Sequence, residues 1–169
     1  MALRCYRCDV KPIFLLLAAL LLVPATHAVE AGHDNPEARP FAEAPAPEAE
    51  VKSAFARAKA AEKRVMLIFG LDACHDSRGL AGWFETPRFA AMLQANYEIV
   101  WIDVGRDRKR HRSLAEQFGV APIVGTPTVL VLDADGAPLN LAHAGGWRNA
   151  ASRSEDEIFD YFAKLGSAE

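Results

Sequence analysis

The chain has 169 residues, of which 51% are hydrophobic and 24% are charged, with a formal net charge of −3 at pH 7. Such a length and composition are typical of a globular protein with one domain and some additional chain. Its one basic cluster, residues 106–112, is short and interrupted by Asp107, so nothing indicates that the protein binds nucleic acid.

Residues 1–28 have the pattern of a secretory signal peptide. Arg4, Arg7 and Lys11 precede an apolar run at residues 13–23, which Pro24 and small residues follow. The run is shorter than the ~20 residues that cross a bilayer, which favours cleavage after Ala28 over an uncleaved membrane anchor, the alternative. We therefore expect a periplasmic or secreted protein with no stable membrane insertion after cleavage.

The cysteines leave one thiol for the exported chain. Cys5 and Cys8 lie within residues 1–28, and Cys74 is the third and last cysteine. A single cysteine in a secreted protein cannot form an intrachain disulfide and is a candidate reactive thiol. A buried, inert core cysteine is the alternative interpretation.

The domain is expected to begin near residue 48. Residues 29–47 are rich in Pro, Ala and Glu and predict a disordered or extended tether, because they offer little apolar surface to bury. An amphipathic helix follows, and residues 64–69 (RVMLIF) have the continuous apolar character of a strand buried on both faces. After Gly70 a short loop leads to a helix that starts near Cys74, with Asp72 as its expected N-cap.

The second half of the chain predicts further strands and helices. Residues 87–96 form a helix with a proline in its first turn, residues 97–104 a strand, and residues 111–118 a short helix. A strand at residues 128–132 and a fourth near residues 138–143 should pair as a hairpin around the D-A-D-G turn, and a C-terminal helix begins after Ser154. The order predicts an α/β fold with a mixed sheet of about four strands and helices on both faces.

These features, in this order, resemble the thioredoxin superfamily, and specifically its secreted bacterial members. The buried strand leads to Cys74 at a helix start, residues 101–104 (WIDV) and 118–120 (FGV) follow, and residues 125–128 (GTPT) precede the next strand. Each motif is weak alone, but the ordered set covers about residues 48–166. The resemblance implies a thioredoxin fold with an extra N-terminal helix.

The resemblance also implies an active site. Pro127 is expected to be cis and to face the reactive cysteine, while the backbone of Thr126 pairs with an extended substrate. The unpaired amides at a helix start favour the thiolate of Cys74, whereas Asp72 and Asp76 oppose it, so the sequence leaves the direction of its pKa shift open. His75 can add a positive charge beside it or be an exposed residue without a role, and the Ser77 hydroxyl, one turn further on, can donate a hydrogen bond to the thiolate.

Three departures from the family bear on the activity. Ser77 replaces the second, resolving cysteine, Ala73 stands where tryptophan is common, and Ile68 stands where many members have a buried acid. The dithiol cycle is therefore impossible within the exported chain. We expect monothiol thiol–disulfide exchange through Cys74, with protein disulfides or thiols as partners and glutathione as a candidate small thiol.

Two other functions remain open at this stage. One is a non-catalytic peptide-binding or chaperone module that uses the groove beside Pro127. The other is a peroxidase-like scavenger, which is disfavoured because the sequence shows no peroxide-activating Arg and Thr pattern around Cys74. Neither a cofactor nor a metal is expected, because the histidines and Cys74 lack ligand spacing.

Overall fold

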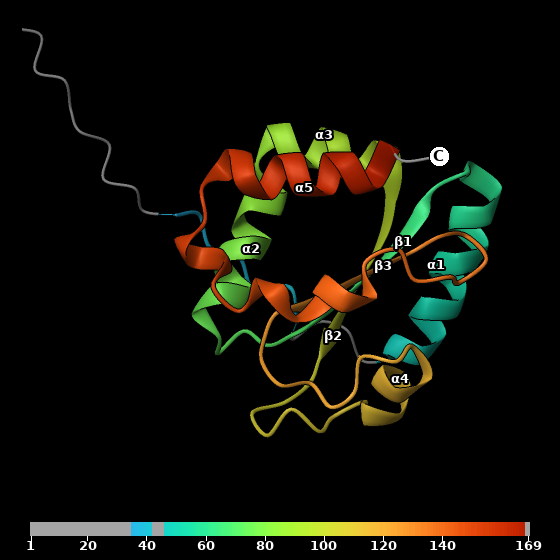
Figure 1. Cartoon of the computed structure of the whole chain (residues 1–169), viewed down its shortest axis with the longest axis horizontal. Coiled ribbons are helices and arrows are strands. Elements are labelled where there is room, and N and C mark those ends of the chain that lie inside the picture. Colours follow the sequence, from blue (N-terminus) through green and yellow to red (C-terminus); the bar gives the residue numbers. More distant parts are fainter. Residues whose placement is uncertain (1–34, 42–45, 168–169) are drawn as a thin grey trace, which may run out of the picture. The chain divides into compact units, whose positions relative to one another are not determined.

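The fold is described from a computed structural model, which covers residues 35–41 and 46–167. The predicted signal peptide, residues 1–28, lies outside these ranges. Within them, no helix combines the length and apolar character that crossing a bilayer requires. The elements, shown in Figure 1, are α1 (Pro47–Ala61), β1 (Arg64–Gly70), α2 (His75–Glu85), α3 (Pro87–Asn96), β2 (Tyr97–Asp103), α4 (Arg112–Gln117), β3 (Thr128–Leu132), the 3₁₀ helices η2 (Leu141–Trp147) and η3 (Ala150–Ser152), and α5 (Glu155–Ser167).

The sheet is mixed, with β1 in its centre. The strand order is β2-β1-β3. β1 runs parallel to β2, with Arg64 opposite Tyr97, and antiparallel to β3, with Val65 opposite Leu132. Six of the seven residues of β1 are buried, which agrees with the expectation of a strand covered on both faces.

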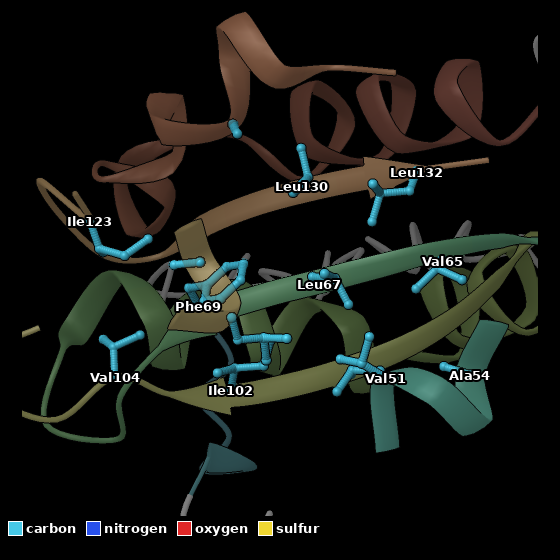
Figure 2. Packing of buried hydrophobic residues seen from close by; sticks show 14 of the residues in the cluster. Val51, Ala54, Val65, Leu67, Phe69, Ile102, Val104, Ile123, Leu130 and Leu132 are labelled. Carbon is cyan, nitrogen blue, oxygen red and sulfur yellow. The ribbon is translucent and has the colours of Figure 1, made fainter. Parts of the chain in front are cut away.

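Helices cover both faces of the sheet and make two hydrophobic cores. Val65, Leu67 and Phe69 of β1 point to the face covered by α1 and α4 (Figure 2). Met66 and Ile68 point to the opposite face, where α2, α3 and α5 pack. Alternate residues of a strand face opposite sides, and each fully buried side chain of this size contributes roughly 1.5–3 kcal/mol. The cores therefore fix the end of β1, which leads to Cys74.

The predicted fourth strand near residues 138–143 is wrong, so the described part of the chain has three strands rather than about four. Pro138 makes a single bridge to Leu132, and the chain then enters η2. The buried side chain of Asn140 takes the place of a strand. Its amide oxygen accepts from Val131 N–H (2.8 Å), and its amide nitrogen donates to the Val129 carbonyl (3.0 Å). Proline has no N–H with which to extend a ladder.

Part of the segment predicted as a disordered tether is packed against the domain. Residues 35–41, which we call the N-terminal strap, include the buried residues Ala38 and Phe41. Phe41 is 1% exposed and belongs to the core on the α2 side of the sheet. The strap lies close to the helix backbone, because a Cβ on Gly82 of α2 would lie 2.0 Å from the Pro36 carbonyl oxygen. One buried aromatic ring thus anchors a segment whose composition predicts no structure.

Candidate functional site

Cys74 lies at the junction of the central strand and α2. It is the N-cap residue of α2, with extended backbone angles (φ −92°, ψ 124°), and its side chain is partly exposed. Its N–H donates to the Leu71 carbonyl (3.0 Å), and its carbonyl accepts from Arg78 N–H (3.1 Å). Cys74 therefore lies at the end of α2 where the first backbone amides have no partner within the helix.

The prediction that Asp72 is the N-cap is wrong, because the N-cap of α2 is Cys74, two residues later. Asp72 uses its carboxylate oxygen Oδ1 to accept a hydrogen bond from the backbone N–H of Phe41 (3.2 Å). A carboxylate can cap a helix only if it reaches the first amides. In this loop it holds the N-terminal strap instead.

The fold brings Cys74 and Thr126 together from positions 52 residues apart. The Cys74 thiol donates to the Thr126 carbonyl at 3.4 Å. The Thr126–Pro127 peptide bond is cis, as is Ala121–Pro122, and Pro127 is buried while Thr126 is partly exposed. No backbone partner for the Thr126 N–H occurs in residues 35–41 or 46–167. This amide is therefore available to a second chain, beside the thiol.

Ser77 does not make the hydrogen bond expected of it. Its side chain is fully buried, and its hydroxyl has no hydrogen-bond partner among the described residues. The hydroxyl lies near Gly70 and Phe41, since a Cβ on Gly70 would be 2.9 Å from Ser77 Oγ and 2.4 Å from Phe41 Cζ. Burial without a partner costs about 1–3 kcal/mol. Ser77 therefore lies behind Cys74 in the core and does not contact its sulfur by a hydrogen bond.

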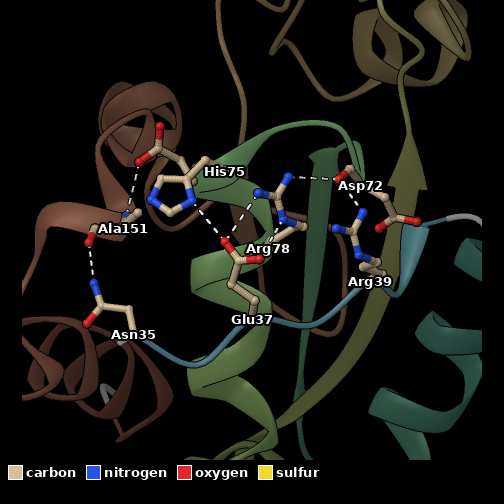
Figure 3. Close-up of polar contacts among 8 residues, drawn as sticks. Asn35, Glu37, Arg39, Asp72, His75, Arg78 and Ala151 are labelled. Carbon is tan, nitrogen blue, oxygen red and sulfur yellow. Dashed lines mark hydrogen bonds and ion pairs between the residues drawn. The ribbon is translucent and has the colours of Figure 1, made fainter. Parts of the chain in front are cut away.

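His75 is joined to the strap through Glu37 (Figure 3). Its side chain is 66% exposed, and its Nδ1 lies 2.9 Å from Glu37 Oε1. Arg78 holds the same carboxylate with two nitrogens, Nε at 2.9 Å and Nη2 at 3.2 Å. The hydrogen bonds from Arg78, and then from His75, hold the pKa of Glu37 below its usual value. His75, which the sequence placed beside Cys74, thus has the carboxylate of Glu37 as its partner.

Arg78 is the residue that the sequence analysis missed. The hydrogen bond to Glu37 raises the pKa of its guanidinium, desolvation opposes this, and the charges of Cys74 and Asp72 add to the increase. Its Nη1 also donates to the Asp72 carbonyl (3.1 Å). Arg78 therefore places a guanidinium, held by Glu37 and by the Asp72 carbonyl, one helical turn from Cys74. The i, i+4 spacing from Cys74 to Arg78 was the signal that could have identified it.

The strap is fixed to both sides of α2. Asn35 donates to the Ala151 carbonyl, Ala38 N–H donates to the Arg78 carbonyl (3.1 Å), and Arg39 donates to the Asp72 carbonyl (3.2 Å). These contacts place the strap along α2, the helix that begins at Cys74 (Figure 3). The strap therefore forms part of the site.

The described residues show no metal centre. Residues 35–41 and 46–167 contain no group of three or more His, Cys, Asp or Glu side chains that could hold a metal ion. Trp147 is buried, and Trp83 and Trp101 pack against the core on the α2 side.

Comparisons with known proteins agree with this geometry. A family model described as thioredoxin-like matches residues 46–134. Among solved structures, the chain is similar to the crystal structure of a disulphide isomerase from Xylella fastidiosa Temecula1, with 30% sequence identity and a TM-score of 0.69. That match covers 76% of this chain and 97% of the other. No curated protein matches the chain significantly.

Proposed function

The chain belongs to the thioredoxin-like family, and on that premise we propose that it carries out monothiol thiol–disulfide exchange through Cys74. The observation that carries the proposal is the placement of Cys74. Its partly exposed sulfur lies at the N-terminus of α2, 3.4 Å from the carbonyl of Thr126. A nucleophilic thiolate and an unpaired backbone amide are the two features that attack on a disulfide in an extended peptide requires.

The exchange begins when the Cys74 thiol gives its proton to solvent and loses its hydrogen bond to the Thr126 carbonyl. The thiolate attacks one sulfur of a substrate disulfide, so that a bond from Cys74 to that sulfur forms as the substrate S–S bond breaks. The other substrate sulfur leaves with the electron pair and takes up a proton. The products are a mixed disulfide and a free substrate thiol.

A second thiol completes the cycle from outside the chain. A thiolate of the substrate, or of a small thiol such as glutathione, attacks the substrate sulfur of the mixed disulfide and releases Cys74 as a thiolate. Ser77 has no sulfur and cannot perform this step. When the attacking thiol belongs to the same substrate, the result is isomerisation without net oxidation, which is the reaction named for the Xylella protein.

Location and partners follow from the same proposal. Thiol–disulfide isomerisation serves proteins that acquire disulfides, which form in the periplasm or outside the cell. The apolar pattern of residues 13–23 favours export to that compartment. Protein disulfides and thiols are then the substrates, and glutathione is a candidate for the resolving thiol.

The experiment compares the full chain with its Cys74→Ser variant, with Cys5 and Cys8 replaced by Ser in both so that Cys74 is the sole thiol. After incubation with glutathione disulfide or a protein with scrambled disulfides, intact mass spectrometry and non-reducing gels should show mixed disulfides only where Cys74 is present. Identical adducts in the two proteins would contradict the proposal. Equal retention of an unfolded peptide by both proteins, without adducts, would support the non-catalytic binding module instead.

A further inference from the structure

A pocket of about 450 Å³ lies beside the loop that carries Thr126 and Pro127. One wall is formed by residues 119–122, 124 and 125, and the other by residues 141–146 of η2 and Arg148, in the segment drawn in orange in Figure 1. Val124 and Leu141 line the pocket, and their side chains are 73% and 43% exposed. They are two of the three large apolar side chains exposed in the described ranges. Two exposed apolar side chains in a largely polar hollow beside the candidate site provide a mixed surface for a partner.

Arg148 brings a positive charge to the edge of this pocket. Its aliphatic stem lies directly on the backbone of Gly125, because a Cβ there would be 2.1 Å from Arg148 Cδ. Its Nε donates to the Gly145 carbonyl (3.2 Å), and no carboxylate partner of its guanidinium occurs among the residues the structure describes. Gly125 immediately precedes Thr126. The charge is therefore held one residue away from the carbonyl that Cys74 contacts.

A second group of cations lies on the other side of the same loop. A smaller pocket of about 140 Å³ is lined by Arg108 and Lys109 together with residues 121–123. Arg112 and Asp107 also line it; Arg112 pairs with Glu116 (2.7 Å), and the carboxylate of Asp107, which accepts from the backbone N–H of Lys109 (3.2 Å), offsets one of the two other cations. The apolar loop is thus bordered by a small excess of positive charge at this pocket and by Arg148 at the larger one, although the whole chain has a net charge of −3. This surface is complementary to a partner that combines an apolar side chain with acidic ones.

We propose that this surface selects the substrate: an extended, cysteine-containing protein segment that inserts an apolar side chain between Val124 and Leu141 and pairs an acidic side chain with Arg148. The inference rests on the proposed exchange activity of Cys74. Two residues of an extended chain span about 7 Å. A segment paired with Thr126 therefore brings the residues within two positions of its cysteine past Gly125 and into reach of Arg148.

The test uses short peptides whose cysteine is activated as a 2-thiopyridyl disulfide, so that attack by Cys74 releases a chromophore. One peptide has Leu and Glu within two residues of the cysteine, a second has Gln in place of Glu, and a third has Ser in place of Leu. The protein is the full chain with Cys5 and Cys8 replaced by Ser. The Glu peptide should react about fivefold faster than the Gln peptide, as an exposed ion pair allows, and the difference should shrink at high salt.

Matched variants separate this inference from the proposed function. Arg148→Gln should abolish the preference for Glu, and Leu141→Ser should abolish the preference for Leu. Arg88→Gln, the same exchange on α3, should leave both preferences intact. The rate with neutral 2,2′-dithiodipyridine, which needs no peptide recognition, is measured for every form, and each peptide rate is divided by it, so that an effect of a substitution on Cys74 itself is removed.

Each outcome has a separate meaning. A Cys74 that fails to react even with 2,2′-dithiodipyridine would overturn the proposed function together with this inference. Normal reaction with that reagent but equal rates for the Glu and Gln peptides would overturn the inference alone. Glutathione activated as the same 2-thiopyridyl disulfide that reacts faster than the Glu peptide, in a manner dependent on Arg148, would overturn the assignment of the charge to protein segments.

Discussion

Phe41→Ala tests whether the N-terminal strap is a structural part of the site. Phe41 is 1% exposed, and its ring meets Trp101 edge-on with a centroid distance of 5.1 Å. The ring also lies against Gly70, where a Cβ would be 2.4 Å from Phe41 Cζ. No other strap residue is buried as deeply. Its removal should therefore weaken the docking of residues 35–41 as a whole.

The magnitude follows from the burial. Truncation of a core Phe to Ala costs about 3–5 kcal/mol, including the cavity that remains, and the contact with Trp101 supplies about 0.5–1.5 kcal/mol of this. The strap is joined to the domain by docking contacts on α2, so it can detach rather than leave an empty cavity. Detachment limits the loss to the docking free energy of the strap. We therefore expect a decrease of about 3 kcal/mol in the free energy of unfolding, the lower end of the range.

Urea unfolding followed by tryptophan fluorescence measures the loss. Phe118→Ala is the matched control, because Phe118 is only partly buried and stacks on Phe55 at 6.0 Å on the opposite face of the sheet. It should cost about 1 kcal/mol and leave the alkylation rate of Cys74 unchanged, whereas Phe41→Ala should change that rate. A loss below about 1 kcal/mol for Phe41→Ala, with unchanged alkylation, would refute the reasoning.

Three further predictions concern the sheet edge, the missing cysteine and the strap's ion pair. Asn140→Ala should lower the free energy of unfolding by about 2–3 kcal/mol in urea titrations, because the buried backbone groups that Asn140 bonds lose their partners. A loss under about 1 kcal/mol would show that the Asn140 side chain does not replace the hydrogen bonds of a fourth strand. Ser77→Cys should shorten the lifetime of mixed disulfides at Cys74, since Cα atoms three residues apart at a helix start lie about 5 Å apart, within the range that a disulfide spans; mixed disulfides that persist as long as in wild type, followed by intact mass spectrometry, would contradict this. The pKa of Glu37 is lowered on folding, so its ion pair stabilises strap docking above its ordinary pKa of 4.5 and is lost as the pH falls through the lowered value. The amide signal of Ala38 should report this loss by NMR. A Glu37→Gln protein that keeps the same pH dependence would exclude Glu37 as its cause.

Much of the fold could be predicted from the sequence, because the patterns that determine it are local. The continuous apolar run of residues 64–69 predicts β1, and alternate residues of that run form the two cores. Helix α3 begins at Pro87, as the proline in a first turn indicates. The closeness of Cys74 to the Thr126–Pro127 segment was expected only from the resemblance to the thioredoxin superfamily. Nothing in the residues between the two segments specifies how far apart they lie in space.

The errors arose where side chains satisfy backbone groups at long range. Residues 138–143 follow a turn and could pair with β3, but Asn140 supplies by its side chain the hydrogen bonds that a strand would supply by its backbone. The spacing of hydrophobic residues along a sequence cannot show that a side chain replaces the backbone hydrogen bonds of a strand. The N-cap at Asp72 failed for the same reason, because its carboxylate bonds the distant Phe41 amide.

The sequence by itself determined the order of most elements, the central strand and the position of Cys74 at a helix start, because hydrophobic periodicity and residue identity are properties of neighbouring residues. Only the tertiary structure decided what surrounds that thiol. It buries Ser77, brings Glu37 to His75 and Arg78, and lays the stem of Arg148 on Gly125. These contacts join segments remote in sequence, and their positions depend on how whole elements pack, which no local pattern encodes.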